Sequence, residues 1–200
     1  MERYEGVKFT YATKSTSFTY DQRLTTLNHW AVIFSELGLA PVHQSGAYGN
    51  QSYRVENSQF FITKSQMSPE EVLRVDNFVK ILGYDASNLT FSTEGNSTPS
   101  SECFLHNALY DALPCVNAIL HGHSTLLCTY AEKIGIPVTQ QFCDYGTPQL
   151  AESAIKLVDQ NTDFFILKDH GFVALGKDIE TAGKLTLNYY LKLIKLIQSS

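Results

Sequence analysis

The spacing of apolar residues predicts a helix near the start of the chain. Between Asp21 and Leu39, apolar side chains recur every three or four positions, as they do on one face of an α-helix. This stripe consists of Leu24, Leu27, Ala31, Phe34 and Leu37. Gly38 and Pro41 follow, and both residue types commonly end helices. Similar periodicity, or a capping Ser, Thr or Asp, predicts helices over residues 68–75, 102–113, 124–133, 147–158 and 178–197.

Short β-like runs alternate with these helices and predict strands. They occupy residues 47–55, 59–65, 78–84, 89–95, 118–123, 137–142, 163–167 and 171–176. Residues 56–58 have the Glu-Asn-Ser composition of a hairpin turn between the first two runs. Strands that alternate with helices indicate α/β layers around one sheet, with antiparallel hairpins mixed in.

The chain has no internal repeat and no linker long enough to separate two domains, so residues 21–200 are expected to form a single domain. Residues 1–20 alternate hydroxyl-bearing and aromatic side chains. That pattern fits either a loose arm or an added edge strand.

Composition narrows the class of protein. The chain has 200 residues, of which 44% are hydrophobic and 18% charged, as in ordinary globular proteins. Its formal net charge of -5 disfavours non-specific binding to nucleic acid. The longest apolar run, residues 164–167, is too short to span a bilayer, and the N-terminus does not resemble a secretion signal. We therefore expect a cytoplasmic protein without a nucleic-acid or membrane partner, and its four cysteines, none in a CxxC pair, should be reduced.

Three histidines are candidates for a metal site. His121 and His123 stand two positions apart in a predicted strand, so their side chains point to the same face and can bind one ion. A structural pair of histidines is an equally ordinary explanation. His170 lies between two further predicted strands, where strand ends commonly present site residues. Three imidazoles leave an open position on a metal, as in catalytic zinc sites.

A polar loop before the predicted helix at 102–113 offers an acid and hydroxyl groups. Ser100 and Ser101 could help the helix N-terminus bind an anion, and Glu102 could serve as a general base or acid beside a metal. Simple capping of the helix would also explain these residues. The segment 49–54 is either a turn into a strand or a backbone nest with Arg54 near an anion, and Thr63, Lys64 and Ser65 add hydroxyls and an ammonium group.

Taken in order, these segments resemble the class II aldolase/adducin family from about residue 22 to 195. The matching residues are Gly49-Asn50-x-Ser52-x-Arg54, Phe61-Ile62-Thr63, Pro99-Ser100-Ser101-Glu102 with His106, His121-x-His123-Ser124, Gly146-Thr147-x-x-Leu150, His170-Gly171 and Gly176. The resemblance implies a three-layer αβα sandwich with a central, largely antiparallel mixed sheet. It also implies a homotetramer with sites at the subunit boundaries.

The resemblance implies a role for each site residue. His121, His123 and His170 would bind one zinc ion, or another divalent metal, and Glu102 would act as the acid/base. The phosphate of the substrate would be bound by Asn50, Thr63, Ser100 and Ser101. The sequence departs from the family at Gln66, where sugar-phosphate aldolases usually have Gly, and in a short segment after His123. That short segment lacks the insertion that carries a tyrosine acid in an aldolase of the family. Tyr145 is a candidate substitute for this proton donor, or a packing residue.

We therefore expect a zinc-dependent lyase that cleaves a small phosphorylated ketose by a retro-aldol reaction, giving dihydroxyacetone phosphate and an aldehyde. An epimerase or dehydratase on the same scaffold is the nearest alternative. A non-catalytic binding module like the adducin head, or a hydrolase using metal-bound hydroxide, is less favoured by these residues. The last predicted helix is apolar on two sides, which fits either oligomerisation or burial within one subunit.

Overall fold

The computed structural model describes residues 6–43, 46–158 and 162–199. The chain forms ten strands, five α-helices and two 3₁₀ turns in this part. In order they are β1 (Thr10–Ser15), α1 (Arg23–Glu36), β2 (Val42–His43), β3 (Gly46–Ala47), β4 (Gly49–Glu56), β5 (Gln59–Thr63), η1 (Val75–Asn77), β6 (Phe78–Asp85), β7 (Thr90–Glu94), α2 (Cys103–Ala112), β8 (Ala118–Gly122), α3 (Thr125–Tyr130), η2 (Glu132–Ile134), α4 (Pro148–Leu157), β9 (Phe164–Leu167), β10 (Gly171–Gly176) and α5 (Ile179–Gln198).

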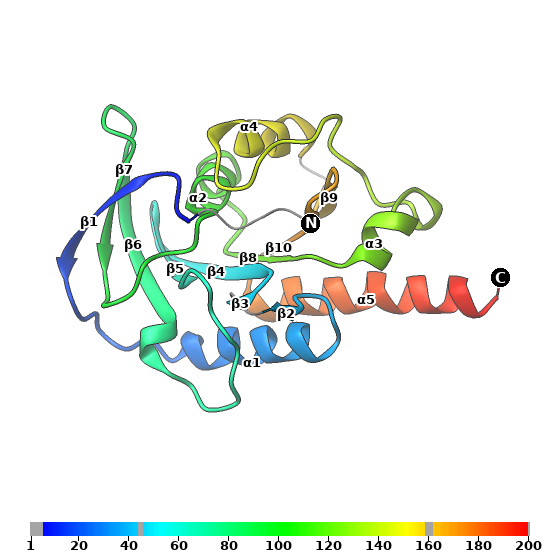
Figure 1. The fold of residues 1–200 in the computed structure, drawn as a ribbon, viewed down its shortest axis with the longest axis horizontal. Coiled ribbons are helices and arrows are strands. Elements are labelled where there is room, and N and C mark those ends of the chain that lie inside the picture. The colour runs from blue at the N-terminus through cyan, green and yellow to red at the C-terminus, as the bar shows by residue number, and fades with distance from the viewer. Residues whose placement is uncertain (1–5, 44–45, 159–161, 200) are drawn as a thin grey trace.

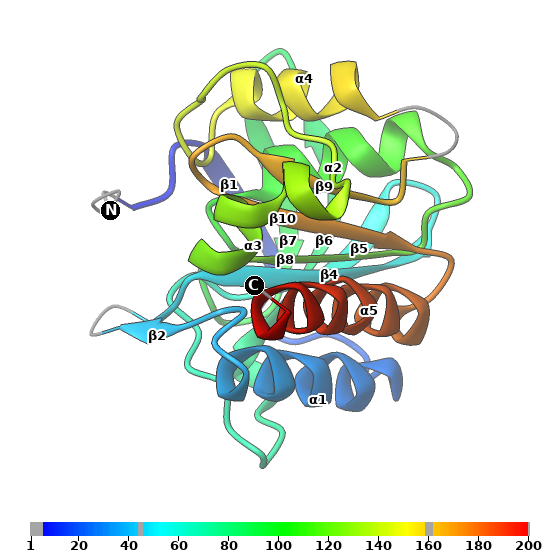
Figure 2. The same cartoon turned by 90° about the vertical axis from the view of Figure 1, so that its right-hand side faces the viewer.

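One eight-stranded sheet organises the molecule, with the strand order β1-β7-β6-β5-β4-β8-β10-β9. Neighbouring strands in this sheet are antiparallel, except that β1 pairs with β7 in parallel. Helices α2 and α4 cover one face of the sheet and α1 and α5 cover the other (Figures 1 and 2). This arrangement confirms the predicted three-layer αβα sandwich around a mixed, largely antiparallel sheet.

The two faces of the sheet carry separate apolar clusters, because side chains alternate along each strand. Leu120 of β8 and Phe172 of β10 belong to the cluster that packs against α1 and α5. Their neighbours Ile119 and Val173 belong to the cluster beneath α2 and α4. Strands buried on both faces explain why the sequence shows near-continuous apolar runs at β8, β9 and β10.

The N-terminal segment includes an edge strand. Residues Thr10–Ser15 pair with β7 at the edge of the sheet, as in the second of the two forms predicted for residues 1–20 (Figure 1). Residues 1–5 lie outside the described part of the chain.

The prediction of a helix over residues 68–75 is wrong. Residues 67–74 form bends and irregular backbone, followed only by the turn η1. A helix this short needs packing to be stable. Here Met67 is buried in the core beneath the sheet, and the Asn28 amide donates a 2.8 Å hydrogen bond to the carbonyl oxygen of Glu70. The segment is therefore held by the core, by a bond from α1 and by the ion pair of Arg74 with Glu70, without forming a helix.

The prediction of a strand over residues 137–142 is also wrong. Only Val138 forms a bridge, in parallel with Ile166 of β9. Pro137 has no N–H to donate, and beyond it the Thr139 hydroxyl accepts a 2.9 Å bond from the amide of Lys168. A side chain takes the place of the next ladder bond, so pairing stops after a single bridge. The other predicted helices and strands are confirmed within a few residues at their ends, except that the helix of 124–133 divides into α3 and η2.

Helices α1 and α5 approach each other closely at Gly183. A Cβ atom at this position would lie 2.3 Å from ring carbons of Trp30, whose indole N–H donates to Glu180 across the same contact. We expect Gly183→Ala to lower the free energy of unfolding by about 1–2 kcal/mol, because overpacking outweighs the higher helix propensity of alanine. Urea denaturation measures this change. Gly83→Ala is the matched control, since nothing lies within 4 Å of a Cβ there. Equal stability of Gly183→Ala and the parent chain would contradict the expectation.

Candidate active site

The three predicted metal ligands lie together at one end of the sheet. His121 is the penultimate residue of β8, His123 follows the end of that strand, and His170 lies in the turn between β9 and β10. One ligand atom from each imidazole lies within 4.8 Å of the others. The rings of His121 and His170 are stacked with centroids 5.2 Å apart. Strand periodicity thus aligned the first two histidines, and the β9–β10 hairpin brings in the third.

The donor atoms fit a divalent cation. His121 Nδ1 lies 2.7 Å from the Phe172 carbonyl oxygen, to which it donates, so Nε2 is directed at the site. That Nε2 atom lies 3.0 Å from His123 Nε2 and 3.1 Å from Glu102 Oε2. The lone pairs of these nitrogens and of the carboxylate oxygen would repel one another at such short separations. A positive charge between them, from bound protons or from a metal ion, removes this repulsion. A ligand set of three imidazoles is typical of catalytic zinc.

Gly171 allows the imidazoles to come this close. A Cβ atom at this position would lie 2.9 Å from His121 Cε1 and 2.4 Å from the Gly122 carbonyl oxygen. A side chain there would push β10 away from β8. The His-Gly sequence at 170–171 therefore combines a ligand with the space that the other rings require.

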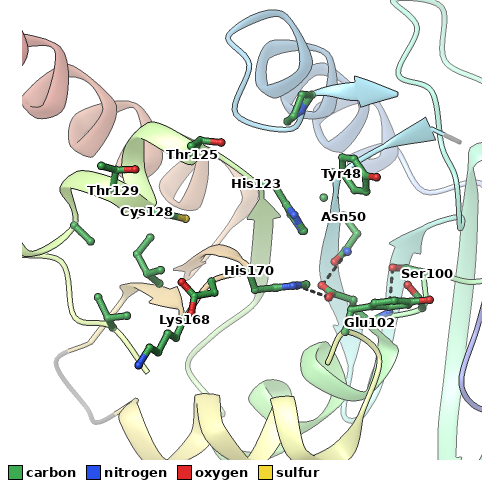
Figure 3. Close-up of a pocket in the computed structure, with 18 of the residues that line it drawn as sticks. Tyr48, Asn50, Ser100, Glu102, His123, Thr125, Cys128, Thr129, Lys168 and His170 are labelled. Carbon is green, nitrogen blue, oxygen red and sulfur yellow. Dashed lines mark hydrogen bonds and ion pairs between the residues drawn. The ribbon is translucent and has the colours of Figure 1, made fainter. Parts of the chain in front are cut away.

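Glu102 lies at the N-cap of α2, yet its carboxylate does not cap the helix. Its Oε1 atom is 2.7 Å from His170 Nε2, and the side chain is buried (Figure 3). Burial alone would raise the pKa of the Glu102 carboxyl, but the imidazoles of His121 and His170 outweigh burial and hold the pKa well below its ordinary value. Ionised Glu102 can therefore accept a proton beside the histidines.

A chain of buried hydrogen bonds fixes the orientation of Glu102. Asn50 Nδ2 donates to Glu102 Oε2 over 3.2 Å, and Asn50 Oδ1 lies 2.6 Å from His106 Nε2. His106 Nδ1 lies 2.6 Å from Ser52 Oγ, which lies 2.7 Å from the Tyr110 hydroxyl. Since an amide oxygen only accepts, Nε2 of His106 carries the proton and Nδ1 accepts from Ser52. Burial lowers the pKa of His106 to about 3, which keeps this imidazole neutral.

The site opens into a pocket of about 940 Å³. Its lining includes Glu102, His123 and His170 at the reactive end, and Tyr48, which stacks on His123 with ring centroids 5.5 Å apart (Figure 3). The wall extends past α3 to Lys168. A cavity of this size is ample for a small sugar phosphate.

The structure brings most of the predicted phosphate-binding residues to this pocket. Asn50, Ser100 and Ser101 line it, although the Asn50 amide is already bonded to Glu102 and His106. Ser100 Oγ also accepts from the Glu102 amide over 3.3 Å, in a turn just before α2, whose N-cap residue Glu102 forms no side-chain capping bond. Thr63 is not among the lining residues. Its hydroxyl is buried and accepts a 3.2 Å bond from the Gln51 amide.

Arg54 does not take part in a nest for an anion. Its guanidinium donates to four main-chain carbonyl oxygens, those of Asn57, Tyr110, Leu113 and Val116. Three of these carbonyls lie at or beyond the C-terminal end of α2, where positive charge is favourable. The role of Arg54 is therefore structural.

Sequence reasoning missed the parts played by three residues. The link of His106 to Glu102 through Asn50 depends on a contact between β4 and α2 that no local pattern reveals. Lys64 lines the pocket, whereas Thr63 does not. Alternation along β5 is the signal that could have separated those two neighbours. The stacking of Tyr48 on His123 has no sequence signature.

Stability should depend on the protonation of His106. The fold holds this imidazole neutral down to about pH 3, whereas an unfolded chain protonates it near its ordinary pKa of 6.5. The unfolded state thus binds more protons below pH 6.5, so this contribution to stability is complete above that pH and is lost as the pH falls toward 3. Between pH 7 and pH 5 the loss is about 2 kcal/mol.

We expect His106→Gln, which keeps a donor for Asn50, to remove that pH dependence. Urea unfolding at pH 7 and pH 5 gives the free energy of unfolding of both proteins. The difference in favour of the parent chain should be smaller by about 2 kcal/mol at pH 5 than at pH 7. His29→Gln on the exposed face of α1 is the control for the change of residue type. An advantage of the same size at both pH values would show that His106 is not held neutral.

Comparison with known proteins gives these residues a family context. The model of the class II aldolase and adducin N-terminal domain matches residues 29–189. An L-fuculose phosphate aldolase of Methanococcus maripaludis (strain C7) is 36% identical over 99 residues, which cover 42% of this chain and 53% of the relative. The match thus spans about half the length of that relative. A methylthioribulose-1-phosphate dehydratase of Yersinia enterocolitica is 26% identical over 182 residues, or 77% of this chain and 80% of the relative.

Solved structures show the same fold. The structure of an L-fuculose 1-phosphate aldolase superposes with a TM-score of 0.72 at 21% identity, covering 90% of this chain and 87% of the other. A sugar-phosphate aldolase of Thermotoga maritima gives a TM-score of 0.70 at 18% identity, covering 90% and 96%. Because the family model extends over well more than half of the sequence, this chain belongs to the family of class II aldolases and adducins.

Proposed function

We propose that this protein is a zinc-dependent lyase that cleaves a small ketose 1-phosphate to dihydroxyacetone phosphate and an aldehyde. The observation that carries the proposal is the buried Glu102 carboxylate, 2.7 Å from His170 Nε2 and 3.1 Å from His121 Nε2. A metal-binding imidazole triad with an acid/base beside it is what cleavage next to a carbonyl group requires. The family and its phosphosugar-processing relatives support the same reaction class.

In this mechanism His121, His123 and His170 hold the metal, which when bound polarises the carbonyl oxygen of the ketose and stabilises negative charge on it. Glu102 accepts the proton of the hydroxyl on the carbon that becomes the aldehyde. The bond between that carbon and its neighbour nearer the carbonyl then breaks, and its electron pair stays with the triose fragment. Glu102 returns the proton to that fragment, so the reaction is balanced and needs no further reactant.

The hydrogen bond from Asn50 keeps one oxygen of Glu102 in a constant orientation during these proton transfers. His106 and Ser52 in turn hold the Asn50 amide. Since all these side chains are buried, water does not compete for their hydrogen bonds. A carboxylate held in this way loses little free energy to reorientation when the substrate binds.

We infer that the substrate phosphate binds against Ser100, Ser101 and Lys64. The two serine side chains and the N-terminal amides of α2 are donors, and an anion is favourable at this helix end. The backbone of Lys64 bridges to Pro99, next to Ser100, and the Lys64 side chain lines the same wall of the pocket. It therefore adds an ammonium group close to the two serines. Within the described residues no carboxylate forms an ion pair with Lys64. Thr63 takes no direct part in this site, because its hydroxyl accepts from the Gln51 amide and does not line the pocket.

A dehydratase acting on a related ketose 1-phosphate is the second candidate. It is favoured by the methylthioribulose-1-phosphate dehydratase relative, which aligns with more of this chain than the first aldolase relative does. Both reactions need a polarised carbonyl and a base, but a dehydratase removes a proton from the carbon next to the carbonyl, whereas the cleavage removes one from a hydroxyl group. A dehydratase releases water and keeps all its carbons in one product, so the mass of the product distinguishes the two. The fourfold assembly that the family resemblance implies stays a prediction.

Glu102→Gln should lower turnover strongly while the metal stays bound. Losing the group that moves the proton is expected to lower kcat by about 10²–10⁴-fold. The assay incubates zinc-loaded protein with a panel of ketose 1-phosphates and couples any triose phosphate to NADH oxidation, with product mass as the second readout. Metal content after dialysis should match the parent chain in Glu102→Gln and fall in His123→Ala. Full activity of Glu102→Gln would remove this residue from the mechanism.

Lys64→Met should weaken binding of phosphorylated substrate. We expect KM to rise by about tenfold with kcat little changed, because a charge-assisted contact of about 1.5 kcal/mol or more is lost. The control is Lys156→Met on the exposed face of α4, which removes the same charge away from the pocket. An equal KM for the Lys64 variant and the parent chain would contradict this placement of the phosphate.

A further inference from the structure

The N-terminal segment, here called the arm and defined as residues 6–15, lies before the part of the chain that the family model matches. Its strand β1 adds to the sheet edge beside β7. Just before the strand, Phe9 packs edge-on against Phe91 of β7 and Phe104 of α2, with ring centroids 4.9 and 5.5 Å apart. The arm is thus anchored to the layer that carries Glu102.

The arm also contacts a wall of the pocket at Tyr145. The carbonyl oxygen of Gly6 accepts a 3.3 Å hydrogen bond from the Tyr145 hydroxyl, and the ammonium group of Lys8 lies 4.1 Å from the centre of the Tyr145 ring. Such a cation–π contact contributes modestly at an exposed site. Tyr145 is itself largely buried and lines the pocket. Both contacts place arm residues directly behind a side chain that faces the pocket.

A second contact reaches the loop that carries the serines and Glu102. The Tyr11 hydroxyl lies 3.0 Å from the Thr98 hydroxyl, and the Thr98 carbonyl oxygen accepts from the Ser65 amide over 2.9 Å. The loop of residues 98–102 is therefore held between the arm and the end of β5. At its other end, Ser101 lies against Gly146, where a Cβ atom would be 2.7 Å from the Ser101 carbonyl oxygen.

We propose that the arm is a positioning element of the pocket, in which Lys8 and Tyr11 hold the Tyr145 wall and the 98–102 loop at a constant separation. Both segments end in groups that line the pocket, yet neither belongs to a regular element at the point of contact. Loops of this kind open locally at low free-energy cost unless outside contacts restrain them. The arm, whose strand β1 forms one edge of the sheet, supplies such contacts to both segments.

The test combines Lys8→Met with Tyr11→Phe and measures amide hydrogen exchange in the full chain by mass spectrometry. Both side chains are exposed, so the variant should fold. We expect exchange in residues 98–104 and 143–147 to become about fivefold faster, as the loss of about 1 kcal/mol of restraint requires. Exchange in α1 should stay as in the parent chain. Tyr20→Phe is the matched control, because it removes an exposed hydroxyl group that hydrogen-bonds to Thr25, away from both segments.

Unchanged exchange in both segments, or faster exchange throughout the molecule, would overturn the proposal. A kinetic measurement, which rests on the proposed function, should show a KM for the ketose phosphate that is about fivefold higher with kcat little changed. If the parent chain turns over no ketose phosphate, the proposed function fails and the exchange data still decide the role of the arm. If exchange rises but KM is unchanged in an active enzyme, the arm does not position the pocket.

Discussion

The contact between the Glu102 carboxylate and the imidazoles of His121 and His170 is the interaction on which the rest of the site depends. An ionised carboxylate buried without partners would cost several kcal/mol, so this group requires positive charge and hydrogen bonds around it. His121 and His170 face one side of the carboxylate, and Asn50 donates from another. The same arrangement that makes burial tolerable also keeps the carboxylate ionised.

The sheet brings these groups together through register. Asn50 lies directly opposite His121 in the antiparallel pair of β4 and β8, so both side chains emerge on the same face. The β9–β10 hairpin turns back at His170 on the next strand. Helix α2 then places Glu102 over this face, and its buried residue His106 supports Asn50 from one turn further along. A one-residue slip of β4 against β8 would turn Asn50 to the opposite face and break the network.

The two faces of the sheet have different tasks. The face beneath α1 and α5 is an apolar core, which gives the strands a rigid support. The face beneath α2 and α4 is apolar in its middle and polar at the end where β4, β8 and β10 present the site. Groups at strand ends and at a helix terminus are held more firmly than groups on loops, while the loop of residues 143–147 forms a wall of the pocket that is free to vary. A family that includes aldolases and dehydratases fits this division between a constant centre and variable walls.

The sequence by itself determined the features that depend on local geometry. The apolar stripes of α1 and α5 and the shared face of His121 and His123 follow from the periods of helix and strand. The order of motifs was enough to indicate the layered fold, and it singled out the three histidines that the structure brings together. Only the tertiary structure decided that Lys64 and not Thr63 lines the pocket, and that Arg54 donates to main-chain carbonyl groups. It also decided that segments 68–75 and 137–142 form neither the predicted helix nor the predicted strand. Glu102 and His170 are 68 positions apart, and a contact at that separation depends on strand order and packing, which no short window of sequence contains.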